Sequence, residues 1–169
     1  MILYIVRHAI AEDRDPSNSE EQDSQRPLTD AGRKKFRQIA RALGSLGAEI
    51  DLILTSPYLR AADTAGILQK RLDLKKDQLI TVDDLAPGGD AERLMTDIRE
   101  KYGTLGNIAL VGHEPGLSRL ISVLLSGDPT LAITLKKGGV CCLSTDKPEY
   151  GRCATLEWLL APAQLTEIG

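Results

Sequence analysis

The chain has 169 residues, of which 42% are hydrophobic and 27% charged, and its formal net charge is −3 at pH 7. These values are typical of one globular domain that spans residues 1–169 and has enough apolar material for a core. The charge gives no general attraction to nucleic acid, and no apolar run approaches the roughly 18 residues of a membrane span. We therefore expect partners other than nucleic acid or membrane.

The cysteines and the N-terminus bear on the cellular compartment. Cys141, Cys142 and Cys153 are an odd set, and their spacing does not match a zinc site. The N-terminus lacks the basic and long apolar segments of a signal peptide. We interpret the cysteines as reduced thiols that serve as small core residues, and the protein as cytoplasmic.

The first expected element is a buried strand followed by two chemically active side chains. Residues 2–6 are uniformly apolar, and Arg7 and His8 follow them directly. Residues 11–25 carry six acidic side chains against one basic, which predicts a long surface loop that leaves from His8. Such a loop is either a solvated connection or the rim of a pocket. Thr29 is then expected to cap an amphipathic helix.

The middle of the chain repeats this pattern. Residues 52–55 form a second apolar run, and Ser56 is expected to cap the next helix with Pro57 at its first position. Arg60 then falls in the first turn, where free N–H groups favour an anion. A third strand is expected over residues 79–82, followed by a loop and a helix.

The last third of the chain contains the other histidine. Residues 108–111 form a further apolar run that leads to His113, and a helix follows from about Pro115. Residues 140–145 and 153–160 predict a β-hairpin around a turn. The alternation of strands and helices predicts a single-domain α/β three-layer sandwich. Its mostly parallel sheet is flanked by helices and completed by the C-terminal antiparallel hairpin.

Two histidines and two arginines are thus expected at the carboxyl edge of one sheet, where α/β folds bind ligands. The guanidinium groups of Arg7 and Arg60 can each bind two phosphoryl oxygens, and a neutral imidazole is a competent nucleophile toward phosphorus. The sequence therefore predicts a phosphate pocket built from Arg7, His8, Arg60 and His113.

Neither a metal nor another cofactor is expected in this pocket. Arg7 would place positive charge beside any metal that His8 held. The His-Glu-x-x-His and paired-carboxylate signatures of hydrolytic metal sites are absent from the sequence, as are the glycine-rich loops of nucleotide-binding proteins.

These features resemble the histidine phosphatase superfamily, the phosphoglycerate mutase-like proteins, and most closely its short SixA-type phosphohistidine phosphatases. The matching pieces come in the family's order and cover residues 2 to about 125. They are Arg7-His8, Pro27-Leu28-Thr29-Asp30-Ala31-Gly32, Ser56-Pro57-Tyr58-Leu59-Arg60-Ala61-Ala62-Asp63-Thr64-Ala65 and Val111-Gly112-His113. The resemblance implies a phosphoglycerate mutase-like fold and a metal-independent phosphatase.

The resemblance also implies a role for each residue of the pocket. His8 attacks phosphorus and forms a phosphohistidine intermediate that water then hydrolyses. Arg7 and Arg60 bind phosphoryl oxygens, and His113 donates to another non-bridging oxygen. Ala9 stands where many relatives have glycine, which would cost about 1 kcal/mol if that position required a positive φ.

The general acid is the second departure from the family pattern. Relatives that act on alkyl or sugar phosphates take a Glu from the loop after the third strand, because an alkoxide needs a proton to leave. Here that loop offers only Asp83 and Asp84, as possible weak general acids. An imidazole leaves more readily than an alkoxide, so a weak acid is tolerable for a phosphohistidine substrate.

The expected function is removal of a phosphoryl group from a histidine of a signalling protein, such as a histidine-phosphotransfer domain, by a monomer. One alternative is a broad-specificity phosphomonoesterase or sugar-phosphate phosphatase of the same fold. A second alternative is a catalytically silent module that binds phosphoproteins.

Overall fold

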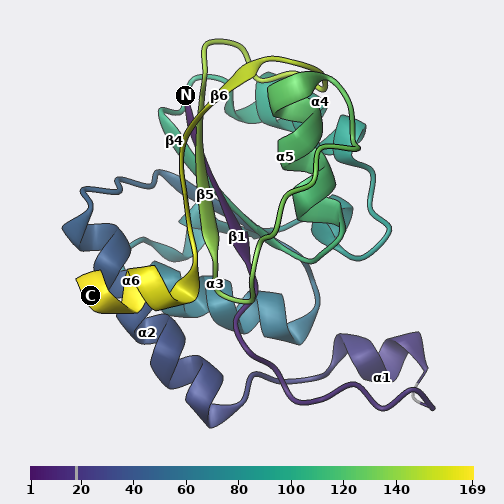
Figure 1. Cartoon of the computed structure of the whole chain (residues 1–169), viewed down its shortest axis with the longest axis vertical. Coiled ribbons are helices and arrows are strands. Elements are labelled where there is room, and N and C mark those ends of the chain that lie inside the picture. Colours follow the sequence, from purple (N-terminus) through teal and green to yellow (C-terminus); the bar gives the residue numbers. More distant parts are fainter. Residues whose placement is uncertain (18) are drawn as a thin grey trace.

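A six-stranded sheet in the order β3-β2-β4-β1-β5-β6 runs through the protein (Figure 1). The computed structural model describes residues 1–17 and 19–169. Strands β3, β2, β4 and β1 are parallel, β5 runs antiparallel to β1, and β6 runs antiparallel to β5. The strands are β1 (Ile2–Arg7), β2 (Leu52–Thr55), β3 (Leu79–Thr81), β4 (Asn107–Gly112), β5 (Val140–Thr145) and β6 (Ala154–Leu160).

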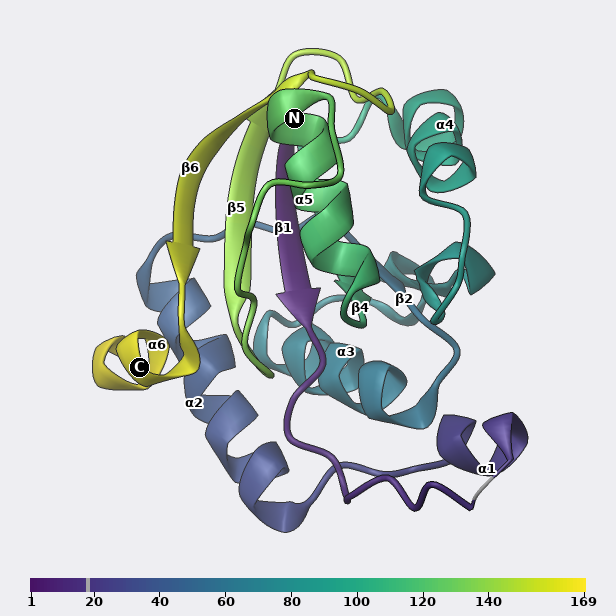
Figure 2. The same cartoon turned by 45° about the vertical axis from the view of Figure 1, so that its right-hand side comes forward.

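Helices cover both faces of this sheet (Figure 2). They are α1 (Glu20–Ser24), α2 (Asp30–Ser45), α3 (Leu59–Arg71), α4 (Ala91–Tyr102), α5 (Gly116–Ser126) and α6 (Pro162–Ile168). Helices α2, α3 and α6 lie on one face and α4 and α5 on the other. None of the helices in the described ranges is both long and apolar enough to cross a membrane.

The alternation of strand side chains builds two hydrophobic cores. Tyr4 and Val6 of β1 pack in the core under α2, whereas Leu3 and Ile5 pack in the core under α5. The fold is therefore the predicted α/β three-layer sandwich, with the expected antiparallel hairpin of β5 and β6.

The start of α2 holds the loop that follows β1. The Thr29 hydroxyl caps the helix as predicted, accepting a hydrogen bond from the Gly32 N–H at 2.9 Å. The Thr29 N–H in turn donates to the Ile10 carbonyl at 3.1 Å. A Cβ on Gly32 would lie 2.1 Å from that same carbonyl oxygen, so only glycine allows the helix to approach this closely. The contact fixes the chain just beyond His8.

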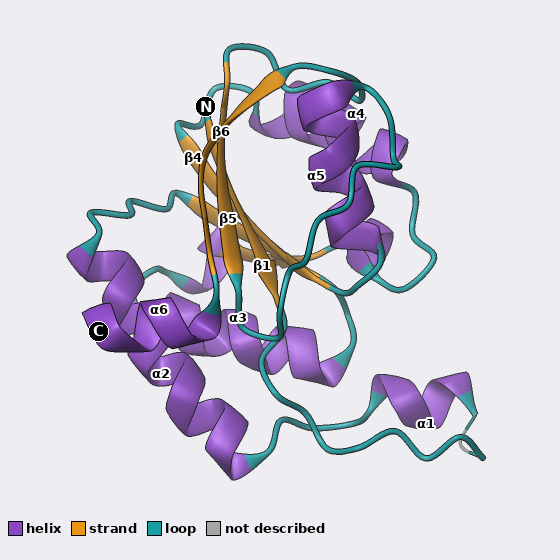
Figure 3. Ribbon diagram, viewed as in Figure 1, coloured by secondary structure: helices purple, strands orange, loops and turns teal. Residues whose placement is uncertain are grey.

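The structure corrects three details of the sequence analysis (Figure 3). Helix α3 begins at Leu59 with Tyr58 as N-cap, so Ser56 does not cap it. The acidic stretch is not loop throughout, because Ser19 caps the short helix α1. Asn18, within that stretch, lies outside the described residues. The C-terminal helix α6 was not predicted.

Candidate active site

The two histidines follow neighbouring parallel strands. His8 comes directly after β1 and His113 directly after β4, and these strands pair with Arg7 opposite Gly112. The two imidazole centroids lie 5.1 Å apart. Strand β2 lies on the other side of β4 and leads into α3, which carries Arg60 in its first turn. The structure thus brings the predicted residues together at one carboxyl edge of the sheet.

The ring of His8 is held as a neutral imidazole with one nitrogen free. Its Nδ1 lies 2.7 Å from the Ala9 carbonyl oxygen, which can only accept, so Nδ1 carries the proton and Nε2 keeps its lone pair. Burial, together with the positive charges of Arg60 and Arg7, lowers the pKa of His8 to about 4. His8 therefore presents an unprotonated nitrogen at neutral pH.

His113 is hydrogen-bonded through the other ring nitrogen. Its Nε2 lies 2.8 Å from the Ser56 hydroxyl oxygen, which also accepts a hydrogen bond from the Tyr58 N–H at 3.2 Å. Among the described residues the Ser56 hydroxyl proton has no other acceptor, so we assign it to Nε2, and the proton of the His113 ring then sits on Nδ1. Burial, followed by His8 and Arg60, lowers the pKa of His113 to about 3. His113 is thus a neutral donor through Nδ1.

The two guanidinium groups are anchored by their outer nitrogens. Arg7 Nη1 donates to the Leu135 carbonyl at 2.8 Å. Arg60 Nη1 and Nη2 donate to the carbonyl and carboxylate of Asp23, at 2.8 Å and 3.1 Å. The Asp23 bonds were not foreseen, and they fix Arg60 from the side of α1. In both arginines Nε is buried without a partner.

Four buried polar atoms lack a hydrogen-bond partner among the described residues, and all four belong to this site. Three are donors: Arg7 Nε, Arg60 Nε and His113 Nδ1. The fourth is Glu114 Oε1. Buried polar groups in native proteins are nearly always paired, so unpaired donors gathered in one place indicate a bound anion. These donors, grouped around the free nitrogen of His8, suit the oxygens of a phosphoryl group.

The cavity around these atoms has a volume of about 500 Å³. Its lining carries five basic side chains (Arg7, Arg14, Arg26, Arg60 and Lys137) and four acidic ones (Asp13, Glu20, Asp23 and Glu114). The acidic 11–25 segment is therefore part of the pocket rim. Tyr58 donates to Glu20 at 2.9 Å and so ties α1 to the start of α3.

Sequence reasoning missed Glu114, Asp23, Ser56 and Lys137 as members of the site. Glu114 is the residue with the clearest signal, because it directly follows His113. Its Oε2 accepts a hydrogen bond from the Ser118 hydroxyl at 2.5 Å, which holds the side chain half-buried at the pocket wall. Glu114 therefore places a carboxyl group at the pocket wall, which the predicted acids Asp83 and Asp84 do not.

Asp83 and Asp84 lie elsewhere. Neither lines the cavity that holds His8. Asp83 is exposed, and Asp84 accepts hydrogen bonds from Arg93 Nε, at 2.8 Å, and from Arg93 Nη2. The bonds from Arg93 hold the pKa of Asp84 below its ordinary value. A carboxylate held ionised in this way is a poor proton donor at neutral pH.

The alanine after the nucleophile carries no backbone strain. Asp73 is the non-glycine residue with a positive φ in the described part of the chain, so Ala9 has an ordinary conformation. Its N–H donates to the Thr64 hydroxyl at 3.0 Å. Replacement of the family's glycine is therefore harmless here.

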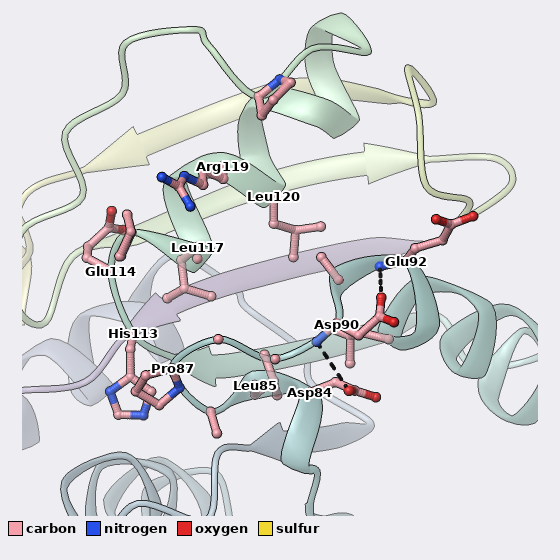
Figure 4. A pocket seen from close by; sticks show the side chains of 18 of the residues that line it. Asp84, Leu85, Pro87, Asp90, Glu92, His113, Glu114, Leu117, Arg119 and Leu120 are labelled. Atoms are coloured by element: carbon pink, nitrogen blue, oxygen red, sulfur yellow. Dashed lines mark hydrogen bonds between the residues drawn. The ribbon is translucent and has the colours of Figure 1, made fainter. Parts of the chain in front are cut away.

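A groove adjoins this cavity at His113 (Figure 4). It has a volume of about 390 Å³ and shares Pro87, His113 and Glu114 with the cavity. Its other walls are the loop before α4 and the first turns of α5. The site is thus a cavity rich in charged side chains with one groove beside it.

Known proteins with the same sequence pattern identify the family of this site. The sequence model of the histidine phosphatase superfamily, branch 1, matches residues 3–105, which include Arg7, His8 and Arg60. The chain belongs to the histidine phosphatase superfamily. It is a phosphatase of the SixA-like type, with the phosphoglycerate mutase-like fold.

Several relatives match nearly the whole chain. The phosphohistidine phosphatase SixA of Escherichia coli is 25% identical over 166 residues, 98% of this chain and 96% of that protein. A structure of the protein histidine phosphatase SixA with tungstate superposes with a TM-score of 0.82 at 25% identity, covering 98% of this chain and 99% of the other. An uncharacterized Picosynechococcus protein is 34% identical over 83% of this chain and 82% of its own length.

The same fold also serves other phosphatases. A structure of the α-ribazole phosphatase from Shigella flexneri superposes with a TM-score of 0.75 at 18% identity, covering 96% of this chain and 97% of the other. This likeness concerns the fold alone, so fold does not decide the substrate.

Proposed function

We propose that this phosphatase removes the phosphoryl group from a phosphohistidine of another protein. The observation that supports the proposal best is the set of unpaired buried donors on Arg7, Arg60 and His113 around the free Nε2 of His8. The similarity to SixA, whose name states a phosphohistidine phosphatase, points to the same substrate class.

The geometry suggests a two-step reaction. His8 Nε2 attacks phosphorus and the bond from phosphorus to the substrate imidazole breaks. That imidazole already carries a proton on its other ring nitrogen, so it leaves as a neutral ring. Arg7, Arg60 and His113 stabilise the charge on the non-bridging oxygens during the transfer. Water then attacks the phosphoryl group on His8, which releases inorganic phosphate and restores the free imidazole.

The substrate preference follows from the acid available. The Asp83–Asp90 loop supplies no proton donor to the pocket, and an imidazole leaving group needs less help than an alkoxide. A histidine-phosphotransfer domain or another signalling protein that carries phosphohistidine would provide such a leaving group. Its phosphorylated side chain would reach His8 through the open pocket.

One observation favours a second candidate, a broader phosphomonoesterase. Glu114 places a carboxyl group at the pocket wall with Oε1 unpaired, and a protonated Glu114 could donate to an alkoxide. Under this second candidate sugar or serine phosphates would be turned over at rates comparable to phosphohistidine.

A substrate panel tests the proposal. The purified protein and His8→Ala are assayed, with and without excess EDTA, on a phosphohistidine peptide, phosphoserine and a sugar phosphate. We expect phosphohistidine to be the best substrate, EDTA to have no effect, and His8→Ala to lose nearly all turnover because it lacks the nucleophile. Activity that EDTA removes and magnesium or zinc restores would refute the mechanism. A sugar phosphate hydrolysed far faster than the peptide would refute the substrate class.

A further inference from the structure

The groove beside the catalytic cavity is built differently from the cavity itself. Its floor is apolar, because Leu85, Leu94, Leu117 and Leu120 line it. Figure 4 shows His113 and Pro87 at one end of the groove, with the side chains of Leu117 and Leu120 farther along it. A charged phosphoryl group is not stabilised by an apolar surface, so the groove suits the part of the substrate that is not phosphorylated.

The charge of the groove is also opposite to that of the catalytic donors. Asp90, Glu92 and Glu114 line it, and none of them has a basic partner within 4 Å among the residues in the described ranges. Arg119 is the one basic side chain in the lining. The cavity therefore offers cationic donors for a phosphoryl group, whereas the adjoining groove has a mainly acidic rim over an apolar floor.

The groove also carries two residue types that are common at protein interfaces. Tyr150 lines the groove and is 45% exposed. Tyrosine and arginine are enriched among residues that dominate protein–protein binding. Arg119, which also lines the groove, forms no ion pair with any of the described residues. A small phosphate ester seated at His8 would leave this part of the groove empty.

We infer that the groove binds the polypeptide segment next to the phosphohistidine of the substrate protein, and that it selects a segment with an apolar and a basic side chain. This inference rests on the proposed function. The apolar side chain would cover the leucine floor, and the basic one would lie against Asp90 and Glu92 while the phosphoryl group occupies the cavity. Continuity through Pro87, His113 and Glu114 puts both parts within one substrate.

One glycine of the lining makes the groove open to experiment. Gly116 lines it at the start of α5, and a Cβ there would meet no heavy atom within 4 Å. Gly116 does not have a positive φ, so Gly116→Leu projects a side chain into the groove without backbone strain. Gly88 has a φ of +81° and Gly89 approaches the Asp84 backbone, so neither offers such a clean change.

The experiment measures binding of short peptides that carry a non-hydrolysable phosphonotriazole in place of phosphohistidine. We expect the peptide with neighbouring Leu and Lys to bind about tenfold more tightly than its Ala and Glu counterparts, the usual range for filling or emptying an apolar pocket. Gly116→Leu should remove the Leu preference. Glu92→Lys should remove the Lys preference, whereas Glu100→Lys, at the far end of the same helix α4 and outside the groove, should keep it.

Hydrolysis of phosphoimidazole, which is too small to reach the groove, shows in parallel that the cavity of each variant is intact. Equal binding of all peptides to the unmodified protein, or equal losses with every peptide in Gly116→Leu, would overturn the inference. Failure to hydrolyse phosphoimidazole and phosphohistidine would instead refute the proposed function. The peptide affinities would still decide on the groove, because they need no turnover.

Discussion

Hydrogen bonds to single atoms decide what each histidine of this site can do. His8 is bound through Nδ1 and keeps Nε2 for attack, whereas His113 is bound through Nε2 and keeps the Nδ1 proton for donation. The sequence gives both residues the same setting after an apolar run. Only their neighbours, the Ala9 carbonyl and the Ser56 hydroxyl, suit His8 to the proposed role of nucleophile and His113 to that of donor.

Glu114 is the first residue whose role can be tested. Glu114→Gln removes the carboxyl group with little change of shape. We expect it to lower kcat for phosphoserine and sugar phosphates by about 10²-fold or more, the usual contribution of a general acid. Phosphohistidine turnover should fall much less. Asp84→Asn is the matched control, because Asp84 is held by Arg93 outside the cavity. If kcat for these phosphate esters fell more in Asp84→Asn than in Glu114→Gln, the general acid would be Asp84 of the predicted loop and not Glu114.

The two neutral histidines also make folding stability depend on pH. Their pKa values are about 4 for His8 and about 3 for His113, against an ordinary value of 6.5. Between pH 6.5 and pH 4 the unfolded chain therefore binds protons that the folded chain does not. The free energy of unfolding should fall as the pH falls through this range, by at most about 1.4 kcal/mol per pH unit for each histidine. Above pH 6.5 these groups contribute no pH dependence.

Urea unfolding at pH 7 and pH 5 measures this effect. His8→Gln cannot take up the proton, so it should lose less stability between the two pH values than the unmodified protein. Carboxylates such as Asp23 contribute equally to both proteins and cancel in the comparison. Equal losses in the two proteins would mean that His8 is protonated in the folded state.

At the scale of elements, α3 connects the segment that follows His8 to the turn that carries Arg60. The Thr64 hydroxyl accepts from the Ala9 N–H at 3.0 Å and donates to the Arg60 carbonyl at 2.6 Å, within the same helix. One side chain thus connects the chain after β1 to the turn that carries Arg60. The Ala9 carbonyl that orients His8 belongs to this connected segment.

Thr64→Val tests this connection, since valine has nearly the shape of threonine but no hydroxyl. The buried Ala9 N–H would lose its partner, which should cost about 1–3 kcal/mol of stability. We expect kcat to fall as well, because the ring of His8 loses part of its orientation. Thr96→Val on α4 is the control, as no side-chain hydrogen bond is described for Thr96. Unfolding by urea and steady-state kinetics give the two readouts, and an unchanged kcat in Thr64→Val would show that α3 does not position His8.

The elements also show where sequence reasoning succeeds and where it stops. Apolar runs ending in His8 and His113 predict strand ends at a common edge, because parallel strands place their carboxyl ends together. The role of α1 could not be predicted, since the 11–25 stretch has no apolar periodicity and Asp23 reaches Arg60 only through the fold. Ser56 illustrates the same limit. Its position before a helix suggests a cap, but its hydroxyl serves a histidine 57 residues further along the chain.

At the scale of the whole molecule, the site stores unfavourable electrostatics that an anion relieves. Burial lowers the pKa of both Arg7 and Arg60, which shows that their charges are costly where they stand. Asp23 compensates Arg60 in part. Although burial opposes it, the guanidinium groups of Arg60 and Arg26 hold the pKa of Asp23 below its usual value. The Nε atoms of both arginines nevertheless have no hydrogen-bond partner among the described residues, which favours binding of an oxyanion here.

A tetrahedral oxyanion should therefore stabilise the whole fold. A ligand that binds only the folded state adds about 2.7 kcal/mol at a concentration of 100 times its Kd. We expect tungstate or phosphate to raise Tm accordingly, beyond the effect of sodium chloride at equal ionic strength. Arg60→Met should lose most of this increase, because it removes one of the three unpaired donors and the charge beside it. Arg71→Met, at the exposed end of the same helix, should keep it.

Differential scanning calorimetry with and without the anion measures the increase in each protein, so any loss of intrinsic stability in Arg60→Met cancels. An equal anion-dependent increase in Arg60→Met and Arg71→Met would show that the anion binds elsewhere on the molecule.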